Sequence, residues 1–130
     1  GLHLINKIDY ITSKRIENAN FLDKELENIP QVKIHSRDKD KIKEVFHIYS
    51  LCYEDRDNLQ NFLIKNDIDA KIHYPIPMHL QKASAKYGYN VGDFPKAEKI
   101  AKSTLSLPVH EFITNEQLEY MSKKIKEFYN

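Results

Sequence analysis

The segment from His73 to His79, which reads His-Tyr-Pro-Ile-Pro-Met-His, holds the densest group of chemically capable side chains in the sequence. Its two prolines fix their own backbone angles, and a stiff loop loses little conformational entropy when it closes around a ligand. Histidine and tyrosine both donate and accept hydrogen bonds. We therefore expect His73, Tyr74 and His79 to contact a ligand such as a sugar. The alternative, in which these side chains only complete a turn and the edge of the core, stays open at this point.

Two other kinds of site use the same residue types. A zinc site built from His73, His79 and His110 is conceivable, but no CxxC or HExxH spacing supports it. Cys52 could form a nucleophilic pair with a histidine. Its place in the apolar run 45–53 favours a small buried hydrophobe instead.

The sequence offers little to hold a phosphate-bearing cofactor. Glycine occurs only at positions 1, 88 and 92, so no glycine-rich loop can bring backbone amides around a phosphate. A lysine that forms a Schiff base needs a desolvated pocket, whereas most lysines here lie in polar surroundings. Lys71, two residues before His73, is the least ordinary of them, and we expect it to be exposed.

Length and charge limit the classes of protein. The chain has 130 residues, enough for one compact domain, and its net charge of +1 gives no field that would gather nucleic acid or a membrane surface. No run of about eighteen apolar residues and no signal-peptide pattern occurs. The single cysteine cannot form an internal disulfide, which fits the reducing cytoplasm.

The spacing of apolar residues predicts one long amphipathic helix at the start of the chain. Between residues 2 and 26 they recur mostly three or four positions apart, with Lys, Arg and Glu between them. No Ser, Thr, Asp or Asn precedes this helix as a cap. We therefore expect the sequence to be part of a longer polypeptide.

The rest of the chain alternates strands and helices, as a two-layer α/β domain does. Asp55 is expected to cap a helix, and Thr114 with Gln117 forms a capping-box signature. The expected elements after the first helix are an edge strand over 31–34, an exposed loop over 35–44, a central strand over 45–53, a helix to 65, a strand over 68–73, a two-turn helix over 80–87, a helix to 102, a strand over 104–107 and a last helix from 114. We predict a single α/β (α+β) domain over residues 1–130 with some antiparallel strands.

Several phrases share their order with one known family. They are Phe46-His47-Ile48-Tyr49, Arg56 with Leu59 and Phe62-Leu63, His73-Tyr74-Pro75-Ile76-Pro77, His79-Leu80-Gln81, Gly92-Asp93-Phe94-Pro95 with Ala97-Glu98, Leu105-Ser106-Leu107-Pro108, and the start Gly1 to Leu4 followed by Lys14-Arg15 and Ala19. Together they resemble the C-terminal domain of the DegT/DnrJ/StrS family of sugar aminotransferases, which depend on pyridoxal 5'-phosphate (PLP).

The resemblance implies the small C-terminal domain of a fold-type I aminotransferase, with a mainly antiparallel sheet flanked by helices. The large domain, which supplies the cofactor lysine and phosphate pocket, is absent from this sequence, so PLP is not expected to bind this chain. The whole enzyme would be a homodimer that moves an amino group from glutamate to a nucleotide-linked keto sugar, with a 3-keto sugar favoured over a 4-keto sugar. Such enzymes serve surface polysaccharide or amino-sugar biosynthesis.

In that family the residues matching His73 and Tyr74 face the sugar, with His79 close behind. The resemblance implies no catalytic, cofactor-binding or metal-binding residue in this chain, which should be inactive alone. Two alternatives from other classes are a non-catalytic module that binds nucleotide sugars and a dimerisation domain that uses the apolar stripe of the first helix.

Overall fold

The computed structural model describes the backbone of residues 2–38 and 41–130, and the side chains of these from residue 4 onward. Gly1 of the expected first-helix motif and residues 39–40 of the expected loop lie outside the described residues. The elements in chain order are α1 (Leu2–Ile5), α2 (Ile8–Leu26), β1 (Val32–Lys33), β2 (Tyr49–Tyr53), α3 (Arg56–Lys65), η1 (Met78–Leu80), η2 (Lys82–Tyr87), α4 (Pro95–Ser103), β3 (Thr104–Leu107) and α5 (Asn115–Tyr129).

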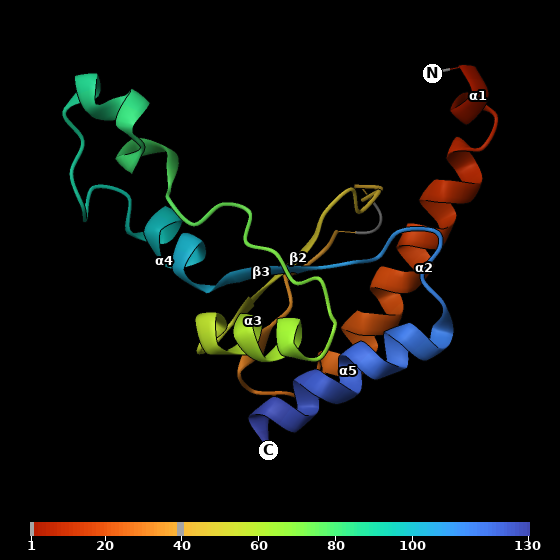
Figure 1. The fold of residues 1–130 in the computed structure, drawn as a ribbon. Helices are drawn as coiled ribbons and strands as arrows, with labels where there is room; N and C mark the ends of the chain where they lie inside the picture. The colour runs from red at the N-terminus through yellow and green to blue at the C-terminus, as the bar shows by residue number, and fades with distance from the viewer. Residues whose placement is uncertain (1, 39–40) are drawn as a thin grey trace.

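The strands form an antiparallel sheet in the order β1-β2-β3, so β2 is central as the sequence predicts. Helix α5 packs against both α2 and α3 beside the sheet, while α4 and the segment before it extend away from these helices (Figure 1). The core is one contiguous cluster. Its largest fully buried side chains are Tyr49, Leu51 and Leu105 from the sheet and Leu22, Leu26, Leu59, Leu63, Leu118 and Ile125 from the helices.

The first helix differs from the prediction because a turn at residues 6–7 separates α1 from α2. Asparagine competes for backbone hydrogen bonds and favours such turns, which explains the break at Asn6. The apolar stripe of the expected helix is buried in one part and exposed in the other. Ala19 and Leu22 are fully buried, whereas Ile5 and Ile8 are more than half exposed.

The central strand is shorter than predicted because Phe46 turns the backbone before the strand begins. Phe46 has a left-handed φ of 47°, and its buried ring lies 6.0 Å from the ring of Tyr49. Because this ring is buried, the first residues of the expected strand lie outside β2, which begins at Tyr49. In β2 the buried side chains are Tyr49, Leu51 and Tyr53, so Cys52 on the other face is only half-buried and not the buried hydrophobe expected.

The expected strand over 68–73 is reduced to one bridge. Lys71 and Ser106 exchange two backbone hydrogen bonds of 3.0 and 2.7 Å across the outer edge of β3. Left-handed Asp67 before this segment and Pro75 after it limit its extended length. The expected helix over 80–87 consists of two short 3-10 turns, η1 and η2, without a buried residue.

In the described part of the expected exposed loop over 35–44, Arg37 faces inward. Arg37 forms ion pairs with Asp23 on α2 and with Glu44, and its guanidinium carbon lies 5.1 Å from the centre of the Phe46 ring. Asp23 also accepts a hydrogen bond of 2.8 Å from the Tyr49 hydroxyl. These contacts attach the loop to α2 and β2. None of the helices in the described part of the chain is long and apolar enough to cross a membrane.

Of the two predicted helix caps, one is confirmed and one is wrong. Asp55 precedes α3, but it has a left-handed φ of 48° and its carboxylate accepts from the Asn58 side chain instead of a helix amide. At α5 the Thr114 hydroxyl accepts from the Gln117 amide, and the Gln117 side chain accepts from the Thr114 amide. The capping box therefore begins the helix that closes the core.

We predict that T114A lowers the free energy of unfolding by about 1 kcal/mol, because the Gln117 amide at the start of α5 loses its acceptor. Urea denaturation followed by circular dichroism measures this difference. T114S, which keeps the hydroxyl, should stay close to the parent protein. Equal losses in T114S and T114A would show that the hydroxyl is not the stabilising group.

Candidate functional site

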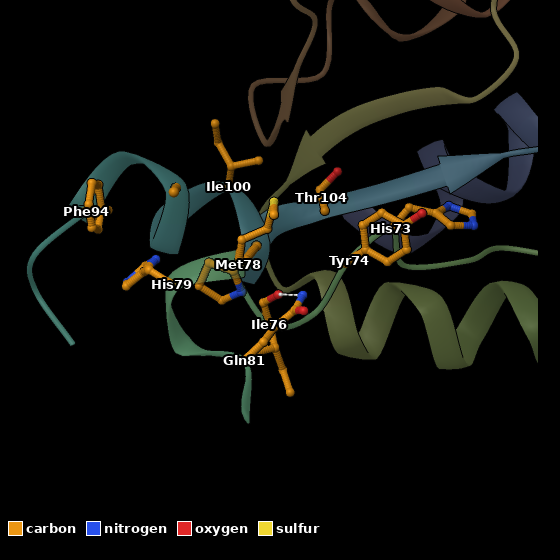
Figure 2. A pocket seen from close by; sticks show the side chains of 12 residues that line it. His73, Tyr74, Ile76, Met78, His79, Gln81, Phe94, Ile100 and Thr104 are labelled. Atoms are coloured by element: carbon orange, nitrogen blue, oxygen red, sulfur yellow. Dashed lines mark hydrogen bonds between the residues drawn. The ribbon is translucent and has the colours of Figure 1, made fainter. Parts of the chain in front are cut away.

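The largest cleft beside the predicted ligand-binding residues has a volume of about 480 Å³ and lies between residues 73–81 and α4. His73, Tyr74 and His79 all line it, together with Ile76, Pro77, Met78, Gln81, Phe94, Ala97, Ile100, Ala101 and Thr104. His73 and Tyr74 lie at the end nearest the sheet, whereas His79 and Phe94 lie beside the start of α4 (Figure 2). The structure therefore brings together the three residues that the sequence singles out.

Local hydrogen bonds fix the loop that carries these residues. The bridge between Lys71 and Ser106 attaches its beginning to β3. Beyond the prolines, the Ser84 hydroxyl donates to the Met78 carbonyl at 2.6 Å. The side-chain amide of Gln81 donates to the Ile76 carbonyl at 3.3 Å. The loop therefore has a defined shape although much of it is exposed.

His73 is oriented by the sheet. Its Nδ1 lies 3.0 Å from the Oγ of Ser106, a buried residue of β3. The edge of its ring meets the Tyr74 ring at 87°, with centroids 5.8 Å apart. Within the described residues no hydrogen bond occupies Nε2, so this nitrogen is available to a ligand.

The surface around Tyr74 is open and largely apolar. Tyr74 is 69% exposed and Met78 80% exposed, and Ile76, Phe94 and Ile100 are each at least 42% exposed. Soluble monomers rarely display a contiguous apolar patch unless it is a binding surface. The cleft therefore has the character of a binding site that, within the described residues, has no wall on its open side.

His79 occupies a different environment. Its side chain is only 8% exposed, its Nε2 lies 3.2 Å from Oε1 of Glu98, and its ring centroid is 4.8 Å from that of Phe94. The imidazole thus forms part of the wall, and one of its ring nitrogens is already used. The ligand contact expected from the sequence therefore suits His73 and Tyr74 better than His79.

Glu98, in the first turn of α4, belongs to a phrase that the sequence shares with the family it resembles, but the sequence analysis assigns this residue no role in the site. Its carboxylate accepts the Gly92 amide at 2.8 Å and the Phe94 amide at 3.3 Å. The Gly92 amide, with help from the Phe94 amide and His79, holds the pKa of Glu98 below its usual range, although partial burial opposes this. The sequence signal for this role of Glu98 was an acidic residue just after Pro95, because carboxylates favour helix N-termini.

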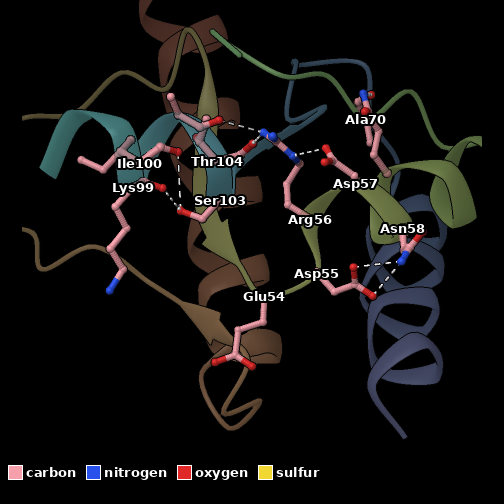
Figure 3. Close-up of polar contacts among 12 residues, drawn as sticks. Glu54, Asp55, Arg56, Asp57, Asn58, Ala70, Lys99, Ile100, Ser103 and Thr104 are labelled. Carbon is pink, nitrogen blue, oxygen red and sulfur yellow. Dashed lines mark hydrogen bonds and ion pairs between the residues drawn. The ribbon is translucent and has the colours of Figure 1, made fainter. Parts of the chain in front are cut away.

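Arg56 supports the other end of α4 (Figure 3). This buried residue donates through Nη1 to the carbonyls of Ala101 and Thr104, at 3.2 and 2.8 Å, and through Nε to Asp57 at 2.7 Å. Ala101 and Thr104 both line the cleft. Arg56 therefore connects α3 to the helix that forms the cleft wall.

The remaining candidate residues lie elsewhere. His110 lines a smaller hollow of about 220 Å³ on the other side of His73, and the described residues contain no group of three potential metal ligands. Cys52 lies opposite Lys33 and Thr104 in the sheet. Lys71 is 60% exposed and paired with Asp69, which confirms the expectation of an exposed lysine.

The cleft does not fit a phosphate-bearing cofactor on its own. No lysine or arginine occurs among its lining residues. Gly88 and Gly92 have positive φ values of 73° and 100°, but each stands singly in the loop before α4. The described residues of the cleft thus supply recognition groups and apolar surface, without a basic cradle.

Comparisons with known proteins agree with this picture. The fold matches the aminotransferase DesV of Streptomyces venezuelae with a TM-score of 0.89 at 26% identity, over 97% of this chain and 34% of that one. In sequence, the chain is 37% identical over 123 residues to the pleiotropic regulatory protein of Geobacillus stearothermophilus, covering 94% of this chain and 33% of the relative. It is 33% identical over 84 residues to the dTDP-3-amino-3,4,6-trideoxy-alpha-D-glucose transaminase of S. venezuelae, covering 65% and 22%.

These matches define the class as the fold-type I aminotransferases. The family model of the DegT/DnrJ/EryC1/StrS aminotransferases matches residues 1–126, and the chain belongs to that family. The family is PLP-dependent, and structural neighbours have been solved in PLP and pyridoxamine phosphate forms. The chain spans about a third of the length of the curated relatives that cover most of it.

The lowered pKa of Glu98 predicts a pH-dependent contribution to stability. Because the folded-state pKa lies below the unfolded value, the contribution is fully present above the unfolded value of about 4.3 and is lost as pH falls through the folded pKa. Thermal unfolding of the parent protein and E98Q at pH 7 and at pH 3 should give a larger difference at pH 7. An equal difference at both pH values would contradict this.

We predict that R56A lowers the free energy of unfolding by about 2 to 3 kcal/mol, because two buried carbonyls lose a charged donor. R56K keeps the charge but lacks the planar fork, so its loss should be smaller. Urea denaturation compares the three proteins. A change below about 0.5 kcal/mol in R56A, the range of ordinary surface substitutions, would exclude a supporting role.

Proposed function

We propose that this chain is the C-terminal, substrate-facing domain of a PLP-dependent aminotransferase that transfers an amino group from glutamate to a nucleotide-linked keto sugar. The observation that carries the proposal is the open cleft that presents His73 and Tyr74 beside exposed apolar side chains. The family and the third of the relatives' length that the chain spans support it. In this view the missing wall belongs to a large domain of the same polypeptide.

The two polar residues of the cleft suit recognition of a sugar. The Ser106 hydroxyl holds the His73 ring, so Nε2 can bond a sugar hydroxyl without reorienting. The exposed Tyr74 hydroxyl can donate to or accept from a second one. Ile76 and Ile100 offer apolar surface to the carbon face of the sugar ring. These residues orient the substrate, and we assign none of them a proton-transfer role.

The cofactor must be held by other parts of the whole enzyme. When bound, PLP supplies the electron sink of an amino-group transfer, and the protein supplies position and electrostatics. The cleft described here offers no basic cradle and no Schiff-base lysine. Half of a site cannot stabilise a transition state, so we propose that this chain alone is inactive and does not retain PLP.

The names of three relatives support a 3-keto sugar. They are the dTDP-3-amino transaminases of Streptomyces venezuelae and Aneurinibacillus thermoaerophilus and the UDP-N-acetyl-3-dehydro-glucosamine aminotransferase of Acidithiobacillus ferrooxidans. Their nucleotides differ, so we propose only the class of substrate. Relatives named for GDP-perosamine synthesis and spore coat polysaccharide support a role in surface polysaccharide or amino-sugar biosynthesis, for which we propose a cytoplasmic homodimer.

A second candidate is a non-catalytic module that binds nucleotide sugars. The observation that favours it is that the cleft presents His73 and Tyr74 within this chain but has no lysine or arginine among its lining residues. Calorimetric titration of this chain with dTDP- and UDP-sugars, without PLP, separates the two candidates. Tight binding by the chain alone favours the module, and binding only by the complete polypeptide favours the enzyme domain.

The tyrosine hydroxyl gives the most specific test of the cleft. In the complete enzyme we predict that Y74F lowers kcat/KM for the nucleotide sugar roughly tenfold, the value of one hydrogen bond. The exposed position of Tyr74 keeps the fold intact. Y87F, at an exposed tyrosine of the same segment that does not line the cleft, is the matched control. Equal activity of Y74F and Y87F in a coupled amination assay would reject the proposed contact.

A further inference from the structure

Glu98 joins three separate parts of the chain through one carboxylate. Oε1 accepts the Gly92 amide at 2.8 Å and the Phe94 amide at 3.3 Å, and lies 3.2 Å from Nε2 of His79. The loop before α4, the first turn of α4 and the turn η1 therefore meet at one atom. We propose that Glu98 is a positioning residue for the substrate cleft, and that His79 acts through Glu98 and not by contact with the substrate.

The location of Glu98 supports a positioning role. Its side chain is 11% exposed and does not line the cleft that contains His73 and Tyr74. It borders a separate hollow of about 250 Å³ behind the loop, lined also by Pro75, Pro77 and Leu80. A ligand in the cleft therefore meets the Phe94 part of the wall, while Glu98 supports that wall without lining the cleft.

His79 is fixed on two sides. Its Nε2 faces Glu98, and its ring packs at 4.8 Å from Phe94, whose ring in turn lies 5.1 Å from Tyr89. With 8% of its side chain exposed, the imidazole has little surface left for a sugar. Its contribution is to keep Phe94 and η1 in place. This differs from the ligand contact expected from the sequence.

The loop before α4 depends on this carboxylate because the other hydrogen bonds among its described residues are internal. The Asn90 amide donates to Asp93, the Asn90 side chain donates to the Gly88 carbonyl, and the Asp93 amide donates to the Asn90 carbonyl. These bonds shape the loop without attaching it to α4. Gly92 itself, at a φ of 100°, is a conformationally permissive residue. Removing the carboxylate leaves two amides and an imidazole without their common acceptor.

The kinetic test uses the complete enzyme and rests on the proposed function. E98A should raise KM for the nucleotide sugar roughly tenfold, with the half-reaction of the amino donor unchanged, because only the sugar wall loosens. E98Q keeps an acceptor oxygen and should stay within about threefold of the parent. In the double mutant E98A/H79A, KM should equal that of E98A. Multiplying effects of the two substitutions would show that His79 contacts the substrate independently and would overturn the proposal.

Amide hydrogen exchange tests the positioning role without any activity. Peptides covering residues 88–98 should exchange faster in E98A than in the parent, whereas E98Q should retain most of the protection. Unchanged exchange in E98A would overturn the proposal. If the parent enzyme aminates no sugar, the proposed function fails, and the exchange result still decides whether Glu98 holds the wall.

Discussion

Hydrogen bonds along both edges of β3 position the end of the candidate site that lies nearest the sheet. On one edge β3 pairs with β2, and on the other Ser106 exchanges two backbone bonds with Lys71. The Ser106 hydroxyl then orients His73, while α4 runs directly into β3 at Thr104. Because all four residues of β3 are buried, the strand cannot shift without disturbing the core. The cleft is therefore built on a fully buried strand.

The wall of the cleft is held by charged side chains at both ends of one helix. Glu98 binds backbone amides at the start of α4, and Arg56 binds backbone carbonyls at its end. Each charge thus meets the helix end of complementary partial charge. The substrate-facing side chains between them can stay largely apolar. This separation of supporting and recognising residues leaves His73 and Tyr74 to offer polar groups to the cleft.

The sequence predicts the parts of this site that depend on local chemistry. The prolines after Tyr74 mark the loop, and Thr114 with Gln117 marks the start of α5, because these effects act over a few residues. Several other features depend on partners distant in the chain. The carbonyl of Phe46, whose φ is left-handed, accepts from Arg15, 31 residues earlier in the chain, and Arg56 donates to the Ala101 carbonyl 45 residues further on. Helical or strand periodicity contains no information about such contacts.

The environment of His79 also depends on a partner distant in the chain, although its residue type suggested a ligand contact. The positioning role that we propose for it follows from Glu98, nineteen residues further along the chain. The Glu98 carboxylate lies within hydrogen-bond distance of one ring nitrogen and helps to bury the ring. Family resemblance placed His79 near the substrate but could not say which way its nitrogens point. Position near a cleft and contact with its ligand are separate properties, and only side-chain geometry separates them.

The central claim is that this chain provides the substrate side of a site whose cofactor side lies elsewhere in the polypeptide. It is tested most directly by recording the visible absorbance spectrum of PLP with the complete polypeptide and with this chain alone. We expect the band of covalently bound cofactor in the complete polypeptide, and only the spectrum of free PLP with this chain. The same bound-cofactor band in this chain, or no such band in the complete polypeptide, would contradict the account.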